Sequence, residues 1–161
     1  MKVPPTSAAV LTISDSTHRG DRKDVSGPAV AALLKKKGFA VVTAGVVSDD
    51  QPKIEHALRR LAAKAQLVVT TGGTGIAARD VTPEATRAVC GRIVEGLAER
   101  MRAQGAKQTK FAALSRGVCG TLGKSLIVNL PGNPTAAKDS LAAIIDLVPH
   151  ALELLAGNTE H

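Results

Sequence analysis

The sequence predicts a single doubly wound α/β domain over residues 1–161, with one mostly parallel sheet and helices on both of its faces. Apolar runs of strand length alternate with helical segments of about 10–15 residues, a pattern typical of parallel strands joined by crossover helices. The length lies in the range of one domain. No repeat, low-complexity tract or linker interrupts the alternation, so we expect no second domain.

Five segments are expected to be strands because they are short and mostly apolar. They cover residues 8–14, 40–47, 67–71, 111–114 and 125–130. Helices are expected at about residues 28–37, 51–65, 82–104 and 138–155, the third broken near Gly91 or Gly96 and the last near Pro149. Thr82 is the expected cap of the third helix, because Pro83 then takes its first position. Residues 1–7 are expected to form a flexible N-terminal extension.

The charge balance favours an anionic partner. Lys and Arg exceed Asp and Glu by 21 to 14, a formal net charge of +7. Proteins that bind single-stranded nucleic acids usually stack bases on aromatic side chains, and Phe39 and Phe111 are the only aromatic residues in the chain. We therefore expect a phosphate-bearing small molecule and no nucleic acid, and a basic nucleic-acid-binding module is the less favoured alternative.

Neither targeting nor metal-binding motifs stand out. No apolar run approaches the roughly 20 residues that a membrane-spanning helix requires, and the first residues lack the apolar stretch of a secretory signal. We expect a cytoplasmic protein that contacts no membrane. Cys90 and Cys119 form no CxxC pair, so they are expected to be reduced thiols, and the four histidines include no i, i+4 pair.

Polar, acidic and glycine-rich segments follow the expected strands. They are residues 14–15, 48–50, 72–75 and 131–134. Ligands of doubly wound proteins bind at the carboxyl ends of the parallel strands. The binding site is therefore expected at this edge of the sheet.

The loop Gly72-Gly73-Thr74-Gly75 places three glycines within four residues after a strand. Glycine adopts positive φ and lets backbone N–H groups approach a phosphate closely. Thr71 and Thr74 add hydroxyl groups beside the loop. We expect these residues to bind an anion such as a nucleotide phosphate.

Two known nucleotide-binding motifs do not account for the chain. Residues 123–125 (Gly-Lys-Ser) resemble the end of a Walker A loop, but Val118 stands where that motif requires glycine and a strand follows. Residues 73–78 fit the spacing of the dinucleotide fingerprint, with Glu95 about 20 residues on. Residues 79–81, however, separate that loop from the expected helix, which the fingerprint does not allow.

Asp49 and Asp80 each follow a strand and are expected to project over the same edge of the sheet. Mg²⁺ usually takes one or two carboxylates together with substrate phosphates, and two aspartates beside a phosphate-binding loop match that requirement. From the residues alone an alternative stays open, in which Asp49 caps a helix and Asp80 shapes a loop. Ser115 and Arg116 are candidates for binding an anionic head group, since Arg presents a planar fork of donors.

In this order, the segments resemble the molybdopterin adenylyltransferases of the MogA and MoaB type, a family that includes the G domains of gephyrin and its plant relative. The matching segments are residues 13–15 with Gly20 and Asp24, and residues 26–28, 47–50, 70–75, 79–86, 114–116 and 129–134. They span about residues 10–155. The ordered set, with Asp-Val-Thr-Pro-Glu-Ala-Thr at residues 80–86, is highly specific.

The resemblance implies a homotrimer that transfers AMP from Mg·ATP to the phosphate of molybdopterin, releasing pyrophosphate, in molybdenum cofactor biosynthesis. It implies that Asp49 and Asp80 are catalytic and organise Mg²⁺ through the substrate phosphates, with no permanently bound cofactor. It assigns nucleotide phosphates to Ser14, Asp15, Thr71, Gly72, Gly73, Thr74 and Gly75, and the pterin to Ser115, Arg116, Leu130, Pro131, Gly132 and Asn133. Contact with the molybdenum-inserting enzyme of the next step is also implied.

The residue types agree with this chemistry. A phosphate nucleophile has a second pKa of about 6 and is largely ionised at neutral pH, so it needs no strong general base, and no catalytic histidine is evident. In one departure from the family pattern, Ser48 stands where proline is common before Asp49. The alternative is a non-catalytic molybdopterin-binding paralogue or scaffold of the same fold, and the presence of both Asp49 and Asp80 favours the enzyme.

Overall fold

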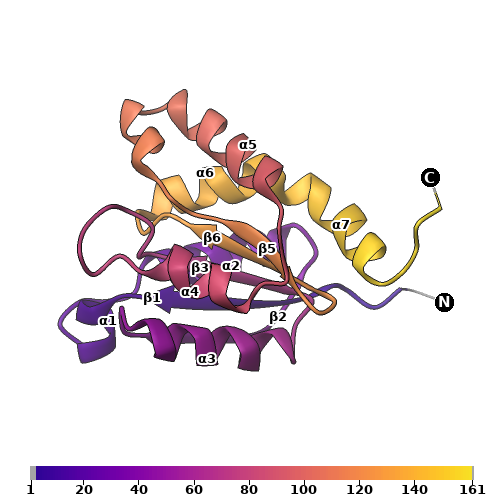
Figure 1. Cartoon of the computed structure of the whole chain (residues 1–161), viewed down its shortest axis with the longest axis horizontal. Helices are drawn as coiled ribbons and strands as arrows, with labels where there is room; N and C mark the ends of the chain where they lie inside the picture. The colour runs from indigo at the N-terminus through magenta and orange to yellow at the C-terminus, as the bar shows by residue number, and fades with distance from the viewer. Residues whose placement is uncertain (1–2, 161) are drawn as a thin grey trace.

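The computed structural model describes residues 3–160, which form a six-stranded sheet in the order β2-β1-β3-β6-β5-β4 (Figure 1). The strands are β1 (Ser7–Ile13), β2 (Ala40–Val47), β3 (Leu67–Thr71), β4 (Arg92–Ile93), β5 (Cys119–Leu122) and β6 (Ser125–Leu130). Strands β2, β1, β3 and β6 are parallel, and β5 and β4 add an antiparallel edge. The predicted α/β fold with a mostly parallel sheet is confirmed.

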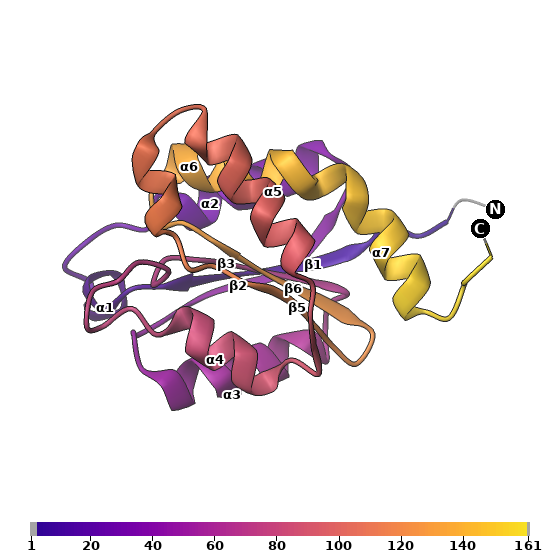
Figure 2. The ribbon, with the colours of Figure 1, turned by 45° about the horizontal axis from the view of Figure 1, so that its top comes forward.

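Helices cover both faces of the sheet, as Figure 2 shows. One face carries α2 (Ser26–Lys36), α5 (Glu95–Ala106), α6 (Pro134–Ile144) and α7 (Val148–Leu155), and the other carries α3 (Gln51–Ala62) and α4 (Thr82–Val89). The remaining helices are short: α1 (Asp15–Arg19), and the 3-10 helices η1 (Lys110–Leu114) and η2 (Ile145–Leu147). Within residues 3–160, no helix is both long and apolar enough to cross a membrane.

Strand β3 lies between two hydrophobic cores, because alternate side chains of a strand point to opposite faces. Leu67 and Val69 pack in the core under α2, α5, α6 and α7, and Val68 packs in the core under α3 and α4. All three side chains are fully buried. Burial on both faces explains why this strand is apolar throughout and shows no alternation.

Two of the longer helices begin with side-chain caps at the edge where the site is expected. The Oδ1 atom of Asp50 accepts the N–H of Lys53 at 3.1 Å, so Asp50 is the cap of α3. The Oδ1 atom of Asn133 accepts the N–H of Ala136 at 3.0 Å. Helix α6 therefore begins at Pro134, before the expected start near residue 138.

The strand expected at residues 111–114 is wrong, because this segment is the 3-10 helix η1. The hydroxyl of Thr109 accepts the N–H of Phe111 at 3.2 Å, and the N–H of Ala112 bonds to the Thr109 carbonyl, which turns the backbone. The strand beside β6 is instead β5, joined to it by a turn at Gly123 with φ +58°. Strand β5 was not predicted because its residues, Cys-Gly-Thr-Leu, give a weak apolar pattern.

Smaller corrections concern the ends of elements. The predicted capping role of Thr82 is wrong, since Val81 is the cap of α4 and Thr82 is the first helical residue. Strand β4 interrupts the helix expected to reach residue 104, and the short α1 lies in the segment expected to be a loop. Ser7 is already part of β1, and residues 1 and 2 of the expected extension lie outside the described residues.

Candidate active site

The carboxyl ends of the four parallel strands lie at the same level of the sheet. The register pairs Ile13 with Val47, Thr12 with Thr71, and Thr71 with Leu130. The segments after these strands meet at one edge around a polar pocket of about 420 Å³, here called the aspartate pocket. Of the predicted site residues, its lining includes Ser14, Asp49, Thr71, Gly72, Gly73, Asp80, Gly132 and Asn133.

Asp15 and Asp49 join the loops that follow β1 and β2. The N–H of Asp15 donates to Oδ2 of Asp49, and the N–H of Asp49 donates to Oδ1 of Asp15, both at 2.9 Å. Arg79 holds the Asp15 carboxylate in a fork, with its Nε and Nη2 atoms at 2.9 and 3.0 Å from the two oxygens. This hydrogen-bonded guanidinium lowers the pKa of Asp15 below its ordinary value. Both Asp15 oxygens are engaged, so its position favours a role in shaping the loops.

Asp49 and Asp80 each keep one carboxylate oxygen free. Asp49 uses Oδ2 for the Asp15 amide, and Asp80 uses Oδ2 to accept the N–H of Ala77 at 2.9 Å, while their Oδ1 atoms accept nothing from residues 3–160. Burial raises the pKa of Asp49, and the negative charges of Asp15 and Asp80 raise it further. A cation would relieve that cost. The part of the chain that the structure describes contains no cluster of three or more His, Cys, Asp or Glu suited to a metal, so a cation here would need oxygens from substrate as well.

The glycine loop follows β3 with two residues at positive φ, Gly72 at +94° and Gly73 at +68°. A Cβ at Gly72 would collide with the Ile13 carbonyl, and one at Gly73 would collide with Thr82 Oγ1 and approach Asp49 Oδ1 to 3.2 Å. The Gly72 carbonyl accepts the hydroxyl of Thr82 at 3.0 Å. Gly72 is therefore required where the loop packs against the end of β1, and Gly73 where it packs against Thr82 and Asp49.

The loop offers fewer backbone donors than its sequence suggests. The N–H of Gly72 is used by the Leu130 carbonyl at 3.1 Å. Those of Gly73, Thr74 and Gly75 donate to none of the described residues. Gly73 lines the aspartate pocket and Gly75 lines the second pocket described below, so the amides of these two residues remain available to an anion.

The start of α2 forms a further wall of the aspartate pocket that the sequence-based site lacked. The hydroxyls of Ser26 and Thr71 lie 3.0 Å apart, and the Asp24 carboxylate bonds both the Thr12 hydroxyl and the Gly27 N–H. Ser26 and Asp24 stood in the family-like segments but no role was given to them. Exposed Arg22 and Lys23 also line the pocket and pair with no acid among the described residues. In the sequence, the two adjacent basic residues just before Asp24 could have indicated this part of the pocket.

Arg116 clamps the glycine loop. Its Nε donates to the Gly75 carbonyl at 2.7 Å, Nη2 donates to the Asp80 carbonyl at 2.9 Å, and Glu84 accepts from Nη1 and Nη2 at 2.7 and 3.1 Å. Pairing raises the pKa of Arg116 and lowers that of Glu84. Four of the five guanidinium N–H groups are thus used, so this side chain has little capacity left for the pterin contact that the resemblance implies.

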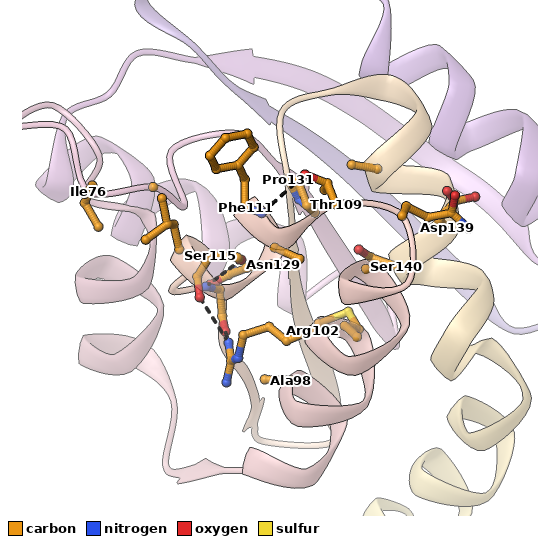
Figure 3. Close-up of a pocket in the computed structure, with 18 residues that line it drawn as sticks. Ile76, Ala98, Arg102, Thr109, Phe111, Ser115, Asn129, Pro131, Asp139 and Ser140 are labelled. Atoms are coloured by element: carbon orange, nitrogen blue, oxygen red, sulfur yellow. Dashed lines mark hydrogen bonds between the residues drawn. The ribbon is translucent and has the colours of Figure 1, made fainter.

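A second pocket of about 420 Å³, here called the apolar pocket, lies beyond the glycine loop (Figure 3). Three predicted residues, Gly75, Ser115 and Pro131, line it. Arg102 supports one wall by donating Nη1 to the carbonyls of Ser115 at 3.4 Å and Gly117 at 3.0 Å. Most of the predicted site residues are therefore divided between two pockets. Fully buried Leu130 lies in the core, and Asp15, Thr74 and Arg116 line neither pocket.

Asn129, in β6, holds the base of the apolar pocket and received no role from the sequence. Its Nδ2 donates to the hydroxyls of Thr70 at 3.1 Å and Thr86 at 2.9 Å, and its Oδ1 accepts the N–H of Val118 at 3.2 Å. A polar side chain this deeply buried is stable only with its partners in place. In the sequence, an amide side chain within a mostly apolar strand could have indicated this role. By contrast, the buried Ser48 hydroxyl has no hydrogen-bond partner among residues 3–160.

A doubly wound sheet with paired aspartates, a glycine loop and an adjoining apolar pocket at its carboxyl edge defines an α/β protein built to bind phosphorylated compounds. Residues 9–150 match the family described as a probable molybdopterin binding domain, and the chain belongs to this family.

Relatives in several organisms are similar in sequence, and solved structures are similar in fold. The chain is 39% identical over 153 residues to the molybdopterin adenylyltransferase of Helicobacter pylori (strain J99), covering 92% of this chain and 87% of that protein. It is 43% identical over 150 residues to the molybdenum cofactor synthesis protein cinnamon of Drosophila melanogaster, covering 91% of this chain but only 25% of that longer protein. The crystal structure of the molybdopterin biosynthesis enzyme MoaB of Thermus thermophilus superposes with a TM-score of 0.88 at 45% identity, covering 94% of this chain and 97% of that one.

Proposed function

We propose that the protein is a molybdopterin adenylyltransferase, which transfers AMP from Mg·ATP to the phosphate of molybdopterin in molybdenum cofactor biosynthesis. One observation carries the proposal: the aspartate pocket and the apolar pocket lie on either side of a shared partition. Gly72 and Gly132 line the aspartate pocket, whereas Gly75 and Pro131, in the same two segments, line the apolar pocket. Two substrates bound in these pockets would meet at the partition.

The two pockets suit different parts of the substrates. The aspartate pocket combines the free amide of Gly73, two carboxylates and the cations Arg22 and Lys23, which suits a triphosphate with its metal. The apolar pocket has a mainly apolar surface that includes Met101 and Phe111, with polar side chains such as Ser115 and Asp139 at its wall, which suits a pterin ring. Ser115 lies on that pocket's wall, where its hydroxyl would bond the pterin.

The reaction needs positioning and charge neutralisation. An oxygen of the molybdopterin phosphate attacks the α-phosphorus of ATP and forms the new P–O bond. The bond from the α-phosphorus to the bridging oxygen breaks, and pyrophosphate leaves with that electron pair. The free amides of Gly73 and Gly75, on the two sides of the partition, would hold the oxygens on which charge develops. The nucleophile is already ionised, so none of these residues has to remove a proton.

The residues of the aspartate pocket fit Mg²⁺, because the Oδ1 atoms of Asp49 and Asp80 are the free hard-oxygen ligands on its wall. Bound there with the nucleotide, Mg²⁺ would neutralise phosphate charge and polarise the α-phosphate. The raised pKa of Asp49 supports the same role, since a cation would stabilise its charged form. ATP would be a substrate, and no permanently bound cofactor is needed.

The test is turnover of ATP with molybdopterin, followed by release of pyrophosphate. We expect pyrophosphate release that requires both substrates and Mg²⁺ and that is lost in Asp49→Asn. The matched control is Asp50→Asn, which removes the neighbouring charge and keeps the α3 cap. A chain that binds molybdopterin without releasing pyrophosphate would be the non-catalytic binding protein or scaffold instead.

We further propose a cytoplasmic homotrimer that passes its product to the molybdenum-inserting enzyme of the next step, as the family resemblance implies. Val42 and Val46 are exposed on the edge strand β2, and such apolar edge surface is commonly covered by a subunit contact. Sedimentation at micromolar concentration tests this assembly. A stable monomer would contradict it.

A further inference from the structure

Phe111 occupies an unusual position for one of only two aromatic residues in the chain. Phe39 is buried in the core and is 8% exposed, whereas Phe111 is 65% exposed on the wall of the apolar pocket. The same pocket is lined by two more exposed apolar residues, Ile76 (71% exposed) and Leu114 (51% exposed). A cluster of exposed large apolar side chains at the rim of a pocket indicates a surface that a ligand covers.

The backbone around Phe111 is held in place. Its N–H donates to the hydroxyl of Thr109 at 3.2 Å, at the start of η1. Helix η1 packs on α5, where a Cβ at Gly105 would lie 3.0 Å from the side chain of Ala112. Figure 3 shows Ile76 and Phe111 on the side of the pocket opposite Asp139. The ring is therefore presented at the rim by a short, anchored turn.

The Lys110 ammonium lies over the Phe111 ring, 5.6 Å from its centroid. A cation at this distance is attracted by the electron-rich face of the ring. Phe111 also lines the apolar pocket and is largely exposed, so part of the ring is accessible to a flat ligand there. Aromatic rings pair with flat heterocycles by offset stacking, which a branched aliphatic side chain cannot reproduce.

We propose that Phe111 stacks on the pterin ring of molybdopterin and selects a flat heterocycle for the apolar pocket. This inference rests on the proposed function and adds a specificity-determining residue to it. Ile76 and Leu114 enclose the ring system from the sides. Phe111 lies outside the aspartate pocket, so it contributes to pterin binding and not to the binding of ATP.

Steady-state kinetics of Phe111→Ala provide the first test. We expect the KM for molybdopterin to rise about tenfold, the gain expected of an aromatic pair plus the lost contact area, with the KM for ATP unchanged. Phe111→Tyr keeps the ring and should restore the KM, whereas Phe111→Leu keeps apolar bulk and should not. The matched control is Leu147→Ala, an exposed apolar residue that lines neither substrate pocket.

Fluorescence provides a second test, because the chain contains no Trp and no Tyr. Phe111→Trp places a single fluorophore at the rim, and its emission should change on titration with molybdopterin and stay constant with ATP. Leu147→Trp is the control, whose emission should stay constant with both. Binding is followed in parallel by equilibrium dialysis of molybdopterin against the wild-type protein.

Each outcome decides the inference. If molybdopterin binds but the emission of Phe111→Trp does not change, or Phe111→Ala keeps its KM, the stacking role is wrong while the proposed function stands. If the emission of Phe111→Trp shifts with protein concentration before any ligand is added, the rim is a contact between copies of the chain and the inference is overturned. If wild-type protein binds no molybdopterin, the proposed function and this inference both fail.

Discussion

The backbone amides of Asp15 and Asp49 each donate to the other residue's carboxylate at 2.9 Å, which ties the loop after β1 to the loop after β2. These two reciprocal hydrogen bonds join residues 34 apart in the chain and leave Asp49 with one free carboxylate oxygen beside the glycine loop. Asp15 is in turn neutralised by Arg79. The pair thus separates two tasks, because Asp15 supports the loops and Asp49 faces the pocket.

Asp80→Asn should lower kcat by about 10²–10³-fold, the typical cost of removing one preorganised charged group at a reacting phosphate. The KM for molybdopterin should change little, since the charge acts mainly as pyrophosphate leaves. The asparagine oxygen still accepts the Ala77 N–H, so the midpoint of thermal unfolding should stay near that of the wild type. Near wild-type turnover would contradict the catalytic role. Unfolding of the variant would mean that Asp80 mainly shapes the loop.

The pH dependence should report Asp49. Burial and the charges of Asp15 and Asp80 raise its pKa above the ordinary 3.8, so activity should rise with pH through that raised pKa as the carboxylate forms. In the same window the folded state binds more protons than the unfolded state, and the free energy of unfolding falls as pH rises. Asp49→Asn has no titrating carboxylate at this position, so its free energy of unfolding should not show this fall.

Relative to the wild type, Asp49→Asn should therefore gain stability with rising pH in the window above 3.8 while remaining inactive. Urea unfolding of both proteins across the acidic range measures the difference. Glu84 has a lowered pKa and does not contact Asp49, so subtracting the two curves removes its opposite contribution. A difference that does not vary with pH would contradict the raised pKa.

Gly73→Ala should damage the site beyond the strain of its backbone. Alanine at positive φ costs about 1–2 kcal/mol by itself, and here its Cβ also collides with Thr82 Oγ1 and approaches Asp49 Oδ1. Gly20→Ala is the matched control, because Gly20 has φ +84° and open space around its Cβ position. We expect Gly20→Ala to lose only stability and Gly73→Ala to lose kcat as well. Equal kcat values in the two variants would exclude the close packing of Asp49 on this loop.

Arg116→Lys should loosen the glycine loop. Lysine cannot bridge Glu84 and the carbonyls of Gly75 and Asp80 at once, because its donors lie on a single atom. We expect a loss of about 1–2 kcal/mol in the free energy of unfolding, moderated by partial exposure, and a raised KM for ATP. Arg59→Lys, in an exposed pair with Glu55, should show neither effect. Unchanged KM and stability for Arg116→Lys would mean that the clamp is dispensable.

The central strands and the glycine loop could be predicted because their causes are local. Residues 67–71 form an apolar run of strand length, and three glycines directly follow it. The carboxyl end of β2 brings Asp49 to this edge by topology alone, whereas the position of Asp80, nine residues after β3, also depends on the fold of its loop. For this reason the edge that holds the candidate site was predictable without any tertiary contact.

The partners of Arg116 and the fold of η1 depend on information that the pattern lacks. Glu84 lies 32 residues before Arg116, and only the folded loop shows that the guanidinium is already occupied. Residues 111–114 are as apolar as a short strand, but the Thr109 hydroxyl offers their backbone a turn instead. The division of the predicted site between two pockets also depends on the folded backbone, which places the adjacent residues Pro131 and Gly132 on the walls of different pockets.

The sheet separates two helical layers that would otherwise open independently, and the aspartate pocket touches both. Asp49 lies just before α3 on one face, and Asn133 caps α6 on the other. Local unfolding of either layer would release a nucleotide held between them, so saturating ATP should slow amide hydrogen exchange in α3 and α6 together. Protection confined to α6 would mean that the nucleotide does not reach Asp49. Protection of both helices would instead mean that the substrate acts as a cross-link between two helical layers whose side chains pack in separate cores.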